Sequence, residues 1–541
     1  MWGRFKNIFL AILSGLLIGS AFPPFDFTMG AFVGLVPLLY LEHQFSEEKK
    51  SKWKLFLLAY VAFVVWNAVA CWWIYYAAQW GGLAFEVLAN SLLFALMFLL
   101  FHFVKKHISK TFWPFALIAL WVSLEFLHFQ NWELSWPWLS LGNVFANRPY
   151  LIQWYEFTGV LGGSAWVLGM NWLLFLCLKE WKINRAFNTH VFRRFIHADF
   201  LLLAPIVISV GLYLTYIEET NPVKVLVVQP NIDPYGEKFG AMGSVQQLEK
   251  AAALAAQKID DSTSYMVLPE TAIHGNNLWE GKLHVTREIG VLAEIVNKHP
   301  QLHIVSGISS DALVYPKDKQ NLPPSYRKFG DADEYYESYN AAVQIDSSFT
   351  FPMYHKSLLV MGAERVPFET IFPSLKELSM DFGGTFGTLG TQKSRSNFSS
   401  LNGKIQVAPI ICYESIYSDY VTEYVRKGAN LLFIVTNDGW WDDTPGYKQH
   451  FAYARIRAIE NRRSVARSAN TGISGFINQK GDVLSQTEWW KPDAISATIN
   501  ANSNETLFTK FPYLVGGVAV SSSFIFLILA VVNQQRKKSI K

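Results

Sequence analysis

The sequence predicts a polytopic α-helical membrane domain of about eight spans that carries an α/β sandwich domain. Two distributions support this prediction. Residues 1–216 contain 25 charged residues, about 12%, whereas 217–541 contain 65, about 20% and close to the soluble norm. Tryptophan is distributed in the opposite sense, with 15 residues before position 217 and 5 after it. The chain therefore divides into an apolar part and a part with the composition of a water-soluble domain.

The overall composition excludes several classes of protein. Hydrophobic residues make up 51% of the chain and aromatic residues 16%, which excludes a disordered chain, a coiled coil and a collagen-like fibre. Three cysteines cannot form a disulfide framework. A net charge of +4 is small for 541 residues, so we expect no nucleic acid as a partner.

Eight apolar runs supply the candidate spans. They lie at about 8–22, 29–41, 55–78, 83–104, 112–129, 160–178, 200–217 and 513–532. A helix needs about 20 residues to cross the hydrocarbon core, so the first two runs are short. Run 8–22 follows Arg4 and Lys6 and could also be a signal peptide. The Pro23-Pro24 turn before a second apolar run favours a helical hairpin instead.

Basic residues between the runs predict the topology. Eighteen lie in alternate segments: Arg4, Lys6, Lys49, Lys50, Lys52, Lys54, Lys105, Lys106, Lys110, Lys179, Lys182, Arg185, Arg193, Arg194, Arg536, Lys537, Lys538 and Lys541. The intervening segments 23–28, 79–82 and 130–159 hold only Arg148. The positive-inside rule then places both termini in the cytoplasm. Seven spans in 1–217 put 218–510 on the extracytoplasmic side, and 511–541 forms the last span and a basic tail.

The soluble region alternates between strand and helix patterns. Predicted strands lie at 223–228, 265–268, 302–306, 340–346, 351–354, 405–411 and 431–435, and predicted helices at 244–259, 281–298, 416–427 and 447–460. Several adjacent strands are joined by short polar links such as Asp346-Ser347-Ser348. This mixture favours an α/β sandwich over a purely parallel doubly wound sheet.

Three predicted strands end in reactive groups: Glu270, Lys356 and Cys412. Each has an ordinary interpretation when taken alone, as a surface ion pair, a solvated charge or an inert buried thiol. Together they supply a base, a cation for an oxyanion and a nucleophile, which are the groups that acyl transfer through cysteine requires. We expect desolvation at the strand end to raise the pKa of Glu270. Cys71 and Cys177 lie in apolar runs and are expected to be inert.

At these residues the sequence resembles the nitrilase superfamily and, more narrowly, its membrane-embedded apolipoprotein N-acyltransferase family. The resemblance extends over nearly the whole chain. Matching stretches are 21–26, 135–139, 142–143, 228–232, 268–271, 354–356, 366–367, 411–414, 436–440, 449–450, 454–455, 457–458 and 470–473. Where the family often has Trp after its first strand, this chain has Lys238-Phe239. The polar segment 313–336 resembles an insertion of no predicted role.

The resemblance implies a nitrilase-like four-layer α-β-β-α sandwich with a Glu-Lys-Cys triad. Cys412 would be the nucleophile, Glu270 the base and Lys356 the oxyanion stabiliser. Glu364, Tyr413 and Glu414 match supporting residues of the family. No cofactor and no metal are implied.

The implied activity is a two-step acyl transfer at a membrane. An acyl chain passes from a phospholipid to the cysteine as a thioester, and then to the α-amine of the N-terminal diacylglyceryl-cysteine of an apolipoprotein. The implied partners are therefore the phospholipid donor, the diacylated acceptor and membrane lipid. The implied location is the bacterial inner membrane, with the catalytic domain facing the periplasm.

Two other functions use the same features. A membrane-tethered nitrilase-type amidohydrolase of a small amide would have the same triad, but it would not need seven leading spans. A transporter with an outer domain would be expected to carry paired charges or broken helices within its spans, and the sequence indicates few of these.

Overall fold

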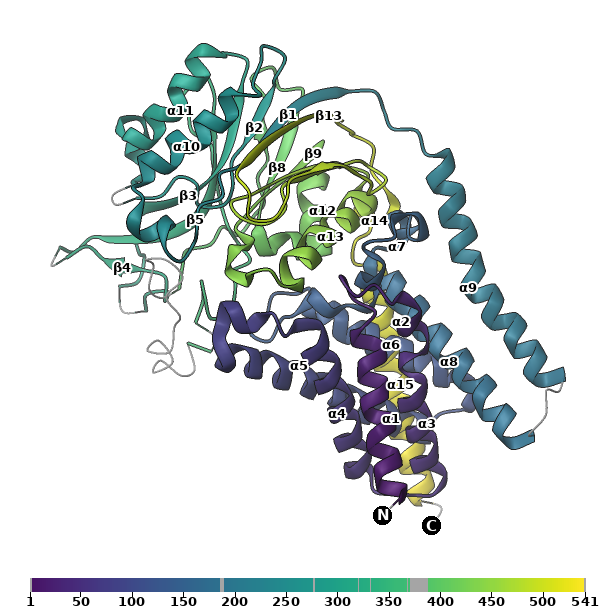
Figure 1. Cartoon of the computed structure of the whole chain (residues 1–541). Coiled ribbons are helices and arrows are strands. Elements are labelled where there is room, and N and C mark those ends of the chain that lie inside the picture. The colour runs from purple at the N-terminus through teal and green to yellow at the C-terminus, as the bar shows by residue number, and fades with distance from the viewer. Residues whose placement is uncertain are drawn as a thin grey trace. The chain divides into compact units, whose positions relative to one another are not determined.

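The protein separates into two compact units in a computed structural model that describes residues 2–184, 189–275, 278–319, 321–330, 332–366, 368–369 and 388–539 (Figure 1). Unit 1 comprises 1–75, 79–216 and 506–541, and unit 2 comprises 76–78 and 217–505. Each unit is described by itself.

Unit 1 is helical. Its α-helices are α1 (Trp2–Gly19), α2 (Thr28–Gly34), α3 (Val36–Glu47), α4 (Lys52–Cys71), α5 (Ile74–His107), α6 (Trp113–His128), α7 (Tyr155–Thr158), α8 (Val160–Asn184), α9 (Thr189–Thr215), α14 (Leu507–Lys510) and α15 (Leu514–Ser539). Among the described residues, six helical segments are long and apolar enough to cross a membrane: 52–71, 74–107, 110–128, 160–182, 192–215 and 514–539. They coincide with six of the eight predicted spans.

The other two predicted spans fall on shorter helices. Run 8–22 lies on α1, whose apolar part is Phe5–Gly19. Run 29–41 is divided between α2 and α3, which begins next to Pro37. The side-chain amide of Asn171 fills this break, because its Nδ2 donates to the Ala31 carbonyl at 2.7 Å and its Oδ1 accepts from the Leu35 N–H at 2.8 Å. An uninterrupted helix would join those two main-chain groups directly. These two spans remain predictions.

A buried charge cluster lies where α3 and α5 end. The carboxylate of Glu42 contacts His102 Nδ1 at 2.8 Å and also the ammonium group of Lys105. All three side chains are buried. From the sequence we expected few paired charges inside the helical domain. The structure shows one such group, formed by these three side chains. Its members satisfy one another, as buried charges require.

Unit 2 contains two mixed sheets. The first has the order β13-β1-β2-β3-β5-β4, with β6 paired to β5, and the second has the order β12-β11-β10-β9-β8-β7. The strands are β1 (Pro222–Gln229), β2 (Tyr265–Val267), β3 (His303–Val314), β4 (Arg327–Lys328), β5 (Tyr335–Ile345), β6 (Met353–His355), β7 (Phe398–Ser399), β8 (Gln406–Ile411), β9 (Leu431–Thr436), β10 (Ser464–Ala469), β11 (Gly475–Ile477), β12 (Val483–Gln486) and β13 (Asp493–Asn500). The strand patterns did not predict β4, β7 or β10 to β13.

Each sheet has a parallel centre and antiparallel edges. Strands β1, β2 and β3 run parallel, as do β8, β9 and β10, whereas β13 pairs antiparallel with β1. The sheets pack face to face, since the rings of Tyr265 and Phe433 meet edge-on at 5.2 Å. Helices α10 (Ser244–Ala256) and α11 (Arg287–Lys298) cover the first sheet, and α12 (Ser418–Arg426) and α13 (Pro445–Asn461) cover the second (Figure 1). The predicted α-β-β-α sandwich is confirmed.

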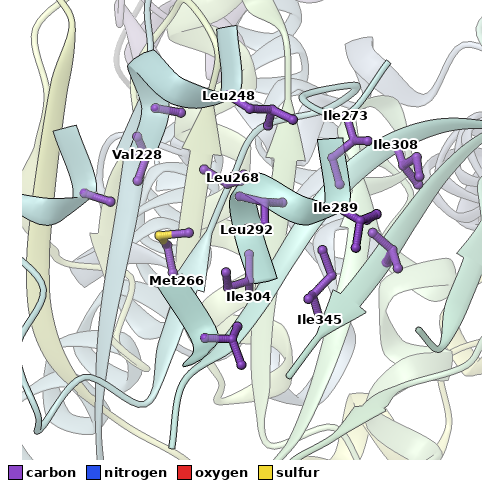
Figure 2. Packing of buried hydrophobic residues seen from close by; sticks show 14 of the residues in the cluster. Val228, Leu248, Met266, Leu268, Ile273, Ile289, Leu292, Ile304, Ile308 and Ile345 are labelled. Atoms are coloured by element: carbon purple, nitrogen blue, oxygen red, sulfur yellow. The ribbon is translucent and has the colours of Figure 1, made fainter. Parts of the chain in front are cut away.

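A hydrophobic cluster between the first sheet and its helices fixes the strand ends (Figure 2). Leu248 of α10 and Leu292 of α11 pack with Met266 of β2 and Ile304 of β3. Burying such side chains contributes about 1.5–3 kcal/mol each. Leu268 and Ile273 belong to the same cluster, so the short segment between them is anchored at both ends.

The predicted insertion 313–336 extends a hairpin. Strands β3 and β5 pair as far as Val314 and Tyr335, and β4 adds two further residues to β5. The described part of this polar segment therefore lies at the edge of the first sheet, where β3, β5 and β4 pair.

Candidate active site

Glu270 follows β2 at the carboxyl end of the parallel strands. The Leu268 N–H donates to the Val305 carbonyl at 2.9 Å, and the Gly307 N–H donates to the Pro269 carbonyl at 3.1 Å. A Cβ atom at position 307 would lie 2.5 Å from the Cα atom of Glu270, so this close approach requires glycine. After Glu270, the Ile273 N–H donates to the Gly307 carbonyl at 3.0 Å, so the main chain on both sides of Glu270 is held by β3.

Lys356 follows β6 and lies between two carboxylates. Its Nζ donates to Oε1 of Glu270 at 3.0 Å and to Oε1 of Glu364 at 2.9 Å. The Lys356 side chain is only 1% exposed. Glu364 is held in turn by the Val360 N–H, which donates to its Oε2 at 2.9 Å. The structure therefore brings Glu270, Lys356 and Glu364 together.

Asn340 of β5 completes this arrangement and was not predicted. Its Nδ2 donates to Oε1 of Glu270 at 2.7 Å and to Oε1 of Glu364 at 2.6 Å. Its main-chain carbonyl also accepts from the Lys356 N–H at 2.8 Å. The sequence showed a polar residue at the start of a predicted strand, but only the strand pairing places it between the carboxylates.

Cys412 lies at the end of β8, where the chain enters the 3₁₀ turn η8 (Cys412–Ile416). Its φ is +48°, a left-handed conformation that costs a non-glycine residue about 1–3 kcal/mol. The side chain is 8% exposed and interacts electrostatically with Glu270, Lys356 and Asp438. The structure thus brings the third predicted strand end to the same buried group.

The charges of this group determine the protonation states. Burial raises the pKa of Glu270, but Lys356, Asn340 and Lys238 outweigh it and hold that pKa below its usual value. The predicted rise was therefore wrong, because strand-end patterns did not reveal these partners. Burial lowers the pKa of Lys356, and the Glu270 and Glu364 carboxylates raise it well above its usual value. Burial and Glu270 raise the pKa of the Cys412 thiol, so the resting cysteine is protonated.

Glu414 joins two of the predicted strand ends. Its Oε1 accepts from the Ser357 N–H and from the hydroxyls of Tyr354 and Tyr420, each at 2.7 Å, and its Oε2 accepts from the Ile411 N–H at 3.0 Å. Burial raises its pKa despite these hydrogen bonds. The carboxylate therefore connects the residue after Lys356 to the residue before Cys412.

Tyr413 lies directly after Cys412 and is buried. Its hydroxyl accepts from the Tyr417 hydroxyl at 3.3 Å, and the two rings meet edge-on at 5.2 Å. This contact fixes the first turn of η8.

A buried polar network supports the main chain of Cys412. Oδ1 of Asp438 lies 3.0 Å from Nδ1 of His450, and its Oδ2 accepts from Arg467 at 2.7 Å. Nε2 of His450 lies 3.2 Å from the Cys412 carbonyl and 2.9 Å from the hydroxyl of Ser415. His450 belongs to a stretch that carried the resemblance, but the sequence did not assign it a role.

Lys238 is a second buried cation beside Glu270. It lies in the π-helical turn η5 (Glu237–Ala241), and its Nζ donates to the Glu270 carbonyl at 3.0 Å and to Oγ1 of Thr271 at 2.6 Å. Burial lowers its pKa to about 8, although Glu270 opposes this shift. The sequence marked Lys238 only as a departure from the family pattern.

The two remaining cysteines belong to the helical unit. Cys71 and Cys177 are buried free thiols of unit 1. Among the described residues, no cluster of three His, Cys, Asp or Glu side chains has the geometry of a metal site. Pro367, which belonged to one matching stretch, lies outside the described residues.

Two family models match the chain. Residues 14–173 match the apolipoprotein N-acyltransferase N-terminal domain, and residues 224–507 match the carbon-nitrogen hydrolase family. An apolipoprotein N-acyltransferase from Chlorobaculum tepidum is 31% identical over 98% of this chain and 97% of its own length. Proteins of the same name from Pasteurella multocida and Thermotoga maritima are 26% and 24% identical over 96% and 97% of this chain, and over 94% of their own lengths in both cases.

Solved structures of the nitrilase superfamily are similar to part of the chain. An amidase mutant from Nesterenkonia matches 55% of this chain and 98% of its own, with 14% identity and a TM-score of 0.36. A Saccharomyces cerevisiae member of the superfamily matches 54% of this chain and 94% of its own, with 15% identity and the same TM-score of 0.36.

Proposed function

The chain belongs to the apolipoprotein N-acyltransferase family, and from this premise we propose that it transfers an acyl chain from a membrane phospholipid to the N-terminal diacylglyceryl-cysteine of an apolipoprotein. It is a membrane acyltransferase of the carbon-nitrogen hydrolase superfamily. The observation that carries the proposed mechanism is the buried group of Glu270, Lys356 and Cys412, which meets at the ends of three strands.

In the first step, Glu270 takes the proton of Cys412 while the sulfur attacks the ester carbonyl. The pKa of the Cys412 thiol is raised and that of the Glu270 carboxyl is lowered, so a free thiolate is unfavourable before the substrate reacts. The proton therefore moves to Glu270 as the sulfur attacks. The Lys356 ammonium stabilises the oxyanion. The ester C–O bond then breaks, the lysophospholipid leaves with a proton from Glu270, and a thioester remains on Cys412.

In the second step, the α-amine of the acceptor attacks the thioester. Glu270 takes a proton from the attacking nitrogen, the C–S bond breaks, and the proton returns to the Cys412 sulfur. The products are the N-acylated lipoprotein and the free thiol. Glu364 and Asn340 hold Lys356 and Glu270 in place throughout, and Tyr413 and Glu414 hold the two strand ends.

The helical unit supports a membrane substrate. Extracting a 16-carbon chain from the bilayer would cost roughly 12 kcal/mol, at about 0.8 kcal/mol per CH₂. A site at the bilayer surface avoids this cost. The basic segments favour cytoplasmic termini and a periplasmic catalytic domain in the bacterial inner membrane.

The test uses the purified full-length protein with labelled phospholipid and a diacylated lipopeptide. We expect N-acylated lipopeptide, and a thioester on Cys412 when the lipopeptide is omitted. Release of free fatty acid without N-acylation would show that water is the acceptor and would refute the transferase. Cys412→Ser and Glu270→Gln should both abolish the thioester. A normal thioester in Glu270→Gln, or an acyl adduct on another residue, would refute these assignments.

A further inference from the structure

The turn that carries Lys238 is fixed through its main chain. The Lys238 N–H donates to the Asp233 carbonyl at 2.9 Å. The Lys238 carbonyl accepts from Nε2 of Gln247 on α10 at 2.7 Å and lies 2.9 Å from Nε2 of His274. Single π-helical turns such as η5 are rare and occur frequently at functional sites. The position of Lys238 is therefore set from α10 and from the segment that follows Glu270.

The Lys238 side chain reaches the main chain of Glu270. Its Nζ donates to the Glu270 carbonyl at 3.0 Å and to Oγ1 of Thr271 at 2.6 Å, and the Thr271 hydroxyl donates to the same carbonyl at 2.8 Å. The φ of Thr271 is +49°, a left-handed conformation that is unfavourable for a β-branched residue. These three hydrogen bonds stabilise the strained main chain from which the Glu270 carboxylate projects.

The charge of Lys238 is not needed for these hydrogen bonds. Both acceptors, a carbonyl and a hydroxyl, are neutral and would accept from a neutral donor as well. Lys238 is only 2% exposed, and burying an ammonium group is unfavourable unless an opposite charge compensates it. The Glu270 carboxylate is such a charge. Burial raises the pKa of Glu270, and Lys238 is one of the groups that lower it. The charge therefore acts on the carboxylate.

We propose that Lys238 is a positioning residue for Glu270, which holds its main chain in place and supplies a positive charge that keeps its carboxylate ionised. The inference rests on the proposed function, because Glu270 must be ionised to accept the thiol proton of Cys412. Lys356 also contacts Glu270, but in the proposed first step its ammonium group binds the oxyanion. Lys238 bonds only to groups of the protein in that step, so its charge stays with the base.

Other titratable groups lie around Glu270 and Lys238: Lys356, Glu364, Cys412 and His274. Burial lowers the pKa of Lys356, but the carboxylates raise it well above its usual value. Burial and Glu270 raise the pKa of Cys412, whereas burial and Lys238 lower that of His274. These three groups therefore keep their protonation states between about pH 7 and 9. Lys238, with a pKa of about 8, loses its proton within this interval.

The first test measures kcat/KM for Cys412 acylation against pH in full-length wild type, Lys238→Gln and Thr271→Val. This ratio reports the pKa of the base in the free enzyme. Removing the nearby positive charge should move the acid limb of Lys238→Gln to higher pH by about one unit or more. Below the wild-type midpoint its rate should then be about tenfold lower. Thr271→Val removes the hydroxyl and keeps the charge, so it should lower the plateau without moving the midpoint.

The matched control is Lys250→Gln on α10. This side chain also donates to a main-chain carbonyl, that of Asn231 at 3.2 Å, so the substitution removes the same charge and the same kind of hydrogen bond elsewhere in the domain. Its pH profile should equal that of wild type. An unchanged midpoint in Lys238→Gln, or an equal shift in Thr271→Val or Lys250→Gln, would overturn the proposal. Wild type that forms no thioester would instead refute the proposed function.

An infrared titration tests the proposal without activity, and it also decides if Lys238→Gln does not fold. The carboxylate band of Glu270 is the band that is missing from the spectrum of Glu270→Gln. In wild type this band should shift as Lys238 loses its proton near pH 8. A band that stays constant from about pH 7 to 9 would overturn the proposal, whether or not the protein transfers acyl chains.

Discussion

Nε2 of His450 lies 3.2 Å from the main-chain carbonyl oxygen of Cys412. The opposite ring nitrogen of His450 lies 3.0 Å from Asp438, which is bound in turn by Arg467. Because the Ser415 hydroxyl donates to the same Cys412 carbonyl at 2.8 Å, the imidazole contributes an N–H at Nε2. The network therefore holds the nucleophile in its left-handed conformation and the thiol at the strand end.

Replacing His450 tests this positioning role. His450→Leu leaves Asp438 and Arg467 without their shared partner, and we expect a loss of about 2–3 kcal/mol of stability. We also expect Cys412 acylation to fall about tenfold or more in kcat, with little change in KM for the phospholipid. His450→Gln places an N–H near the original Nε2 and should recover part of kcat. Equal kcat in the two variants, measured under conditions where both are folded, would contradict the positioning role.

Glu414→Gln should separate the Lys356 and Cys412 strand ends. The amide that replaces Oε2 would present N–H groups to the Ile411 N–H, and Gln cannot accept from all the present donors. We expect a loss of about 2–4 kcal/mol in the free energy of unfolding and a slower thioester formation. Chemical denaturation and the acylation rate measure the two effects.

The control for this variant is Glu423→Gln on α12. Glu423 pairs with Arg395 and Lys427 at the surface, and such pairs contribute about 0–1 kcal/mol. A loss in Glu423→Gln as large as that in Glu414→Gln would show that the buried network has no special role.

The site residues differ in how far the sequence could predict them. Glu270, Lys356 and Cys412 each follow an apolar strand pattern, so the sequence alone could identify them as candidate site residues. Strand pairing brings Asn340 to Glu270, and a π-helical turn brings Lys238 to it. Local periodicity in the sequence predicts neither arrangement. The direction of the Glu270 pKa shift was wrong for the same reason, since it depends on those partners.

The fold shows the same limit. Continuous apolar and β-branched runs located β1, β2, β8 and β9, whose residues are nearly all buried. Strand β10 is also fully buried but reads Ser-Val-Ala-Arg-Ser-Ala, because Arg467 and Ser468 find polar partners inside the sandwich. Because its sequence is polar, the apolar pattern did not predict this central strand of the second sheet.

Lys238 predicts a pH dependence of stability. Its pKa is about 8 in the folded protein, below the ordinary value of 10.5. The unfolded chain therefore binds more protons than the folded chain between these values, and the free energy of unfolding rises with pH. One such group contributes up to about 2 kcal/mol between pH 8 and 9.5. Melting temperatures of wild type and Lys238→Met over this range should diverge, with the steeper rise in wild type. Lys404→Met at an exposed position should behave like wild type, and parallel curves for all three would refute the assignment.

Asn171→Leu should weaken the junction of α2 and α3. Asn171 is fully buried and bridges the Ala31 carbonyl and the Leu35 N–H. Leucine has a similar volume but cannot bond to either group, and unpaired buried main-chain groups cost about 1–3 kcal/mol each. Local opening should then become easier, so hydrogen exchange in 28–40 should accelerate by about tenfold or more, while α15 exchanges as before. Gln535→Leu, an exposed substitution of the same kind, should leave both segments unchanged. Unaltered exchange at Leu35 would contradict this prediction. It would mean that the Leu35 N–H bonds directly to the Ala31 carbonyl when the amide is absent, so that α2 and α3 join into one helix. The break would then be caused by Asn171 and not by Pro37.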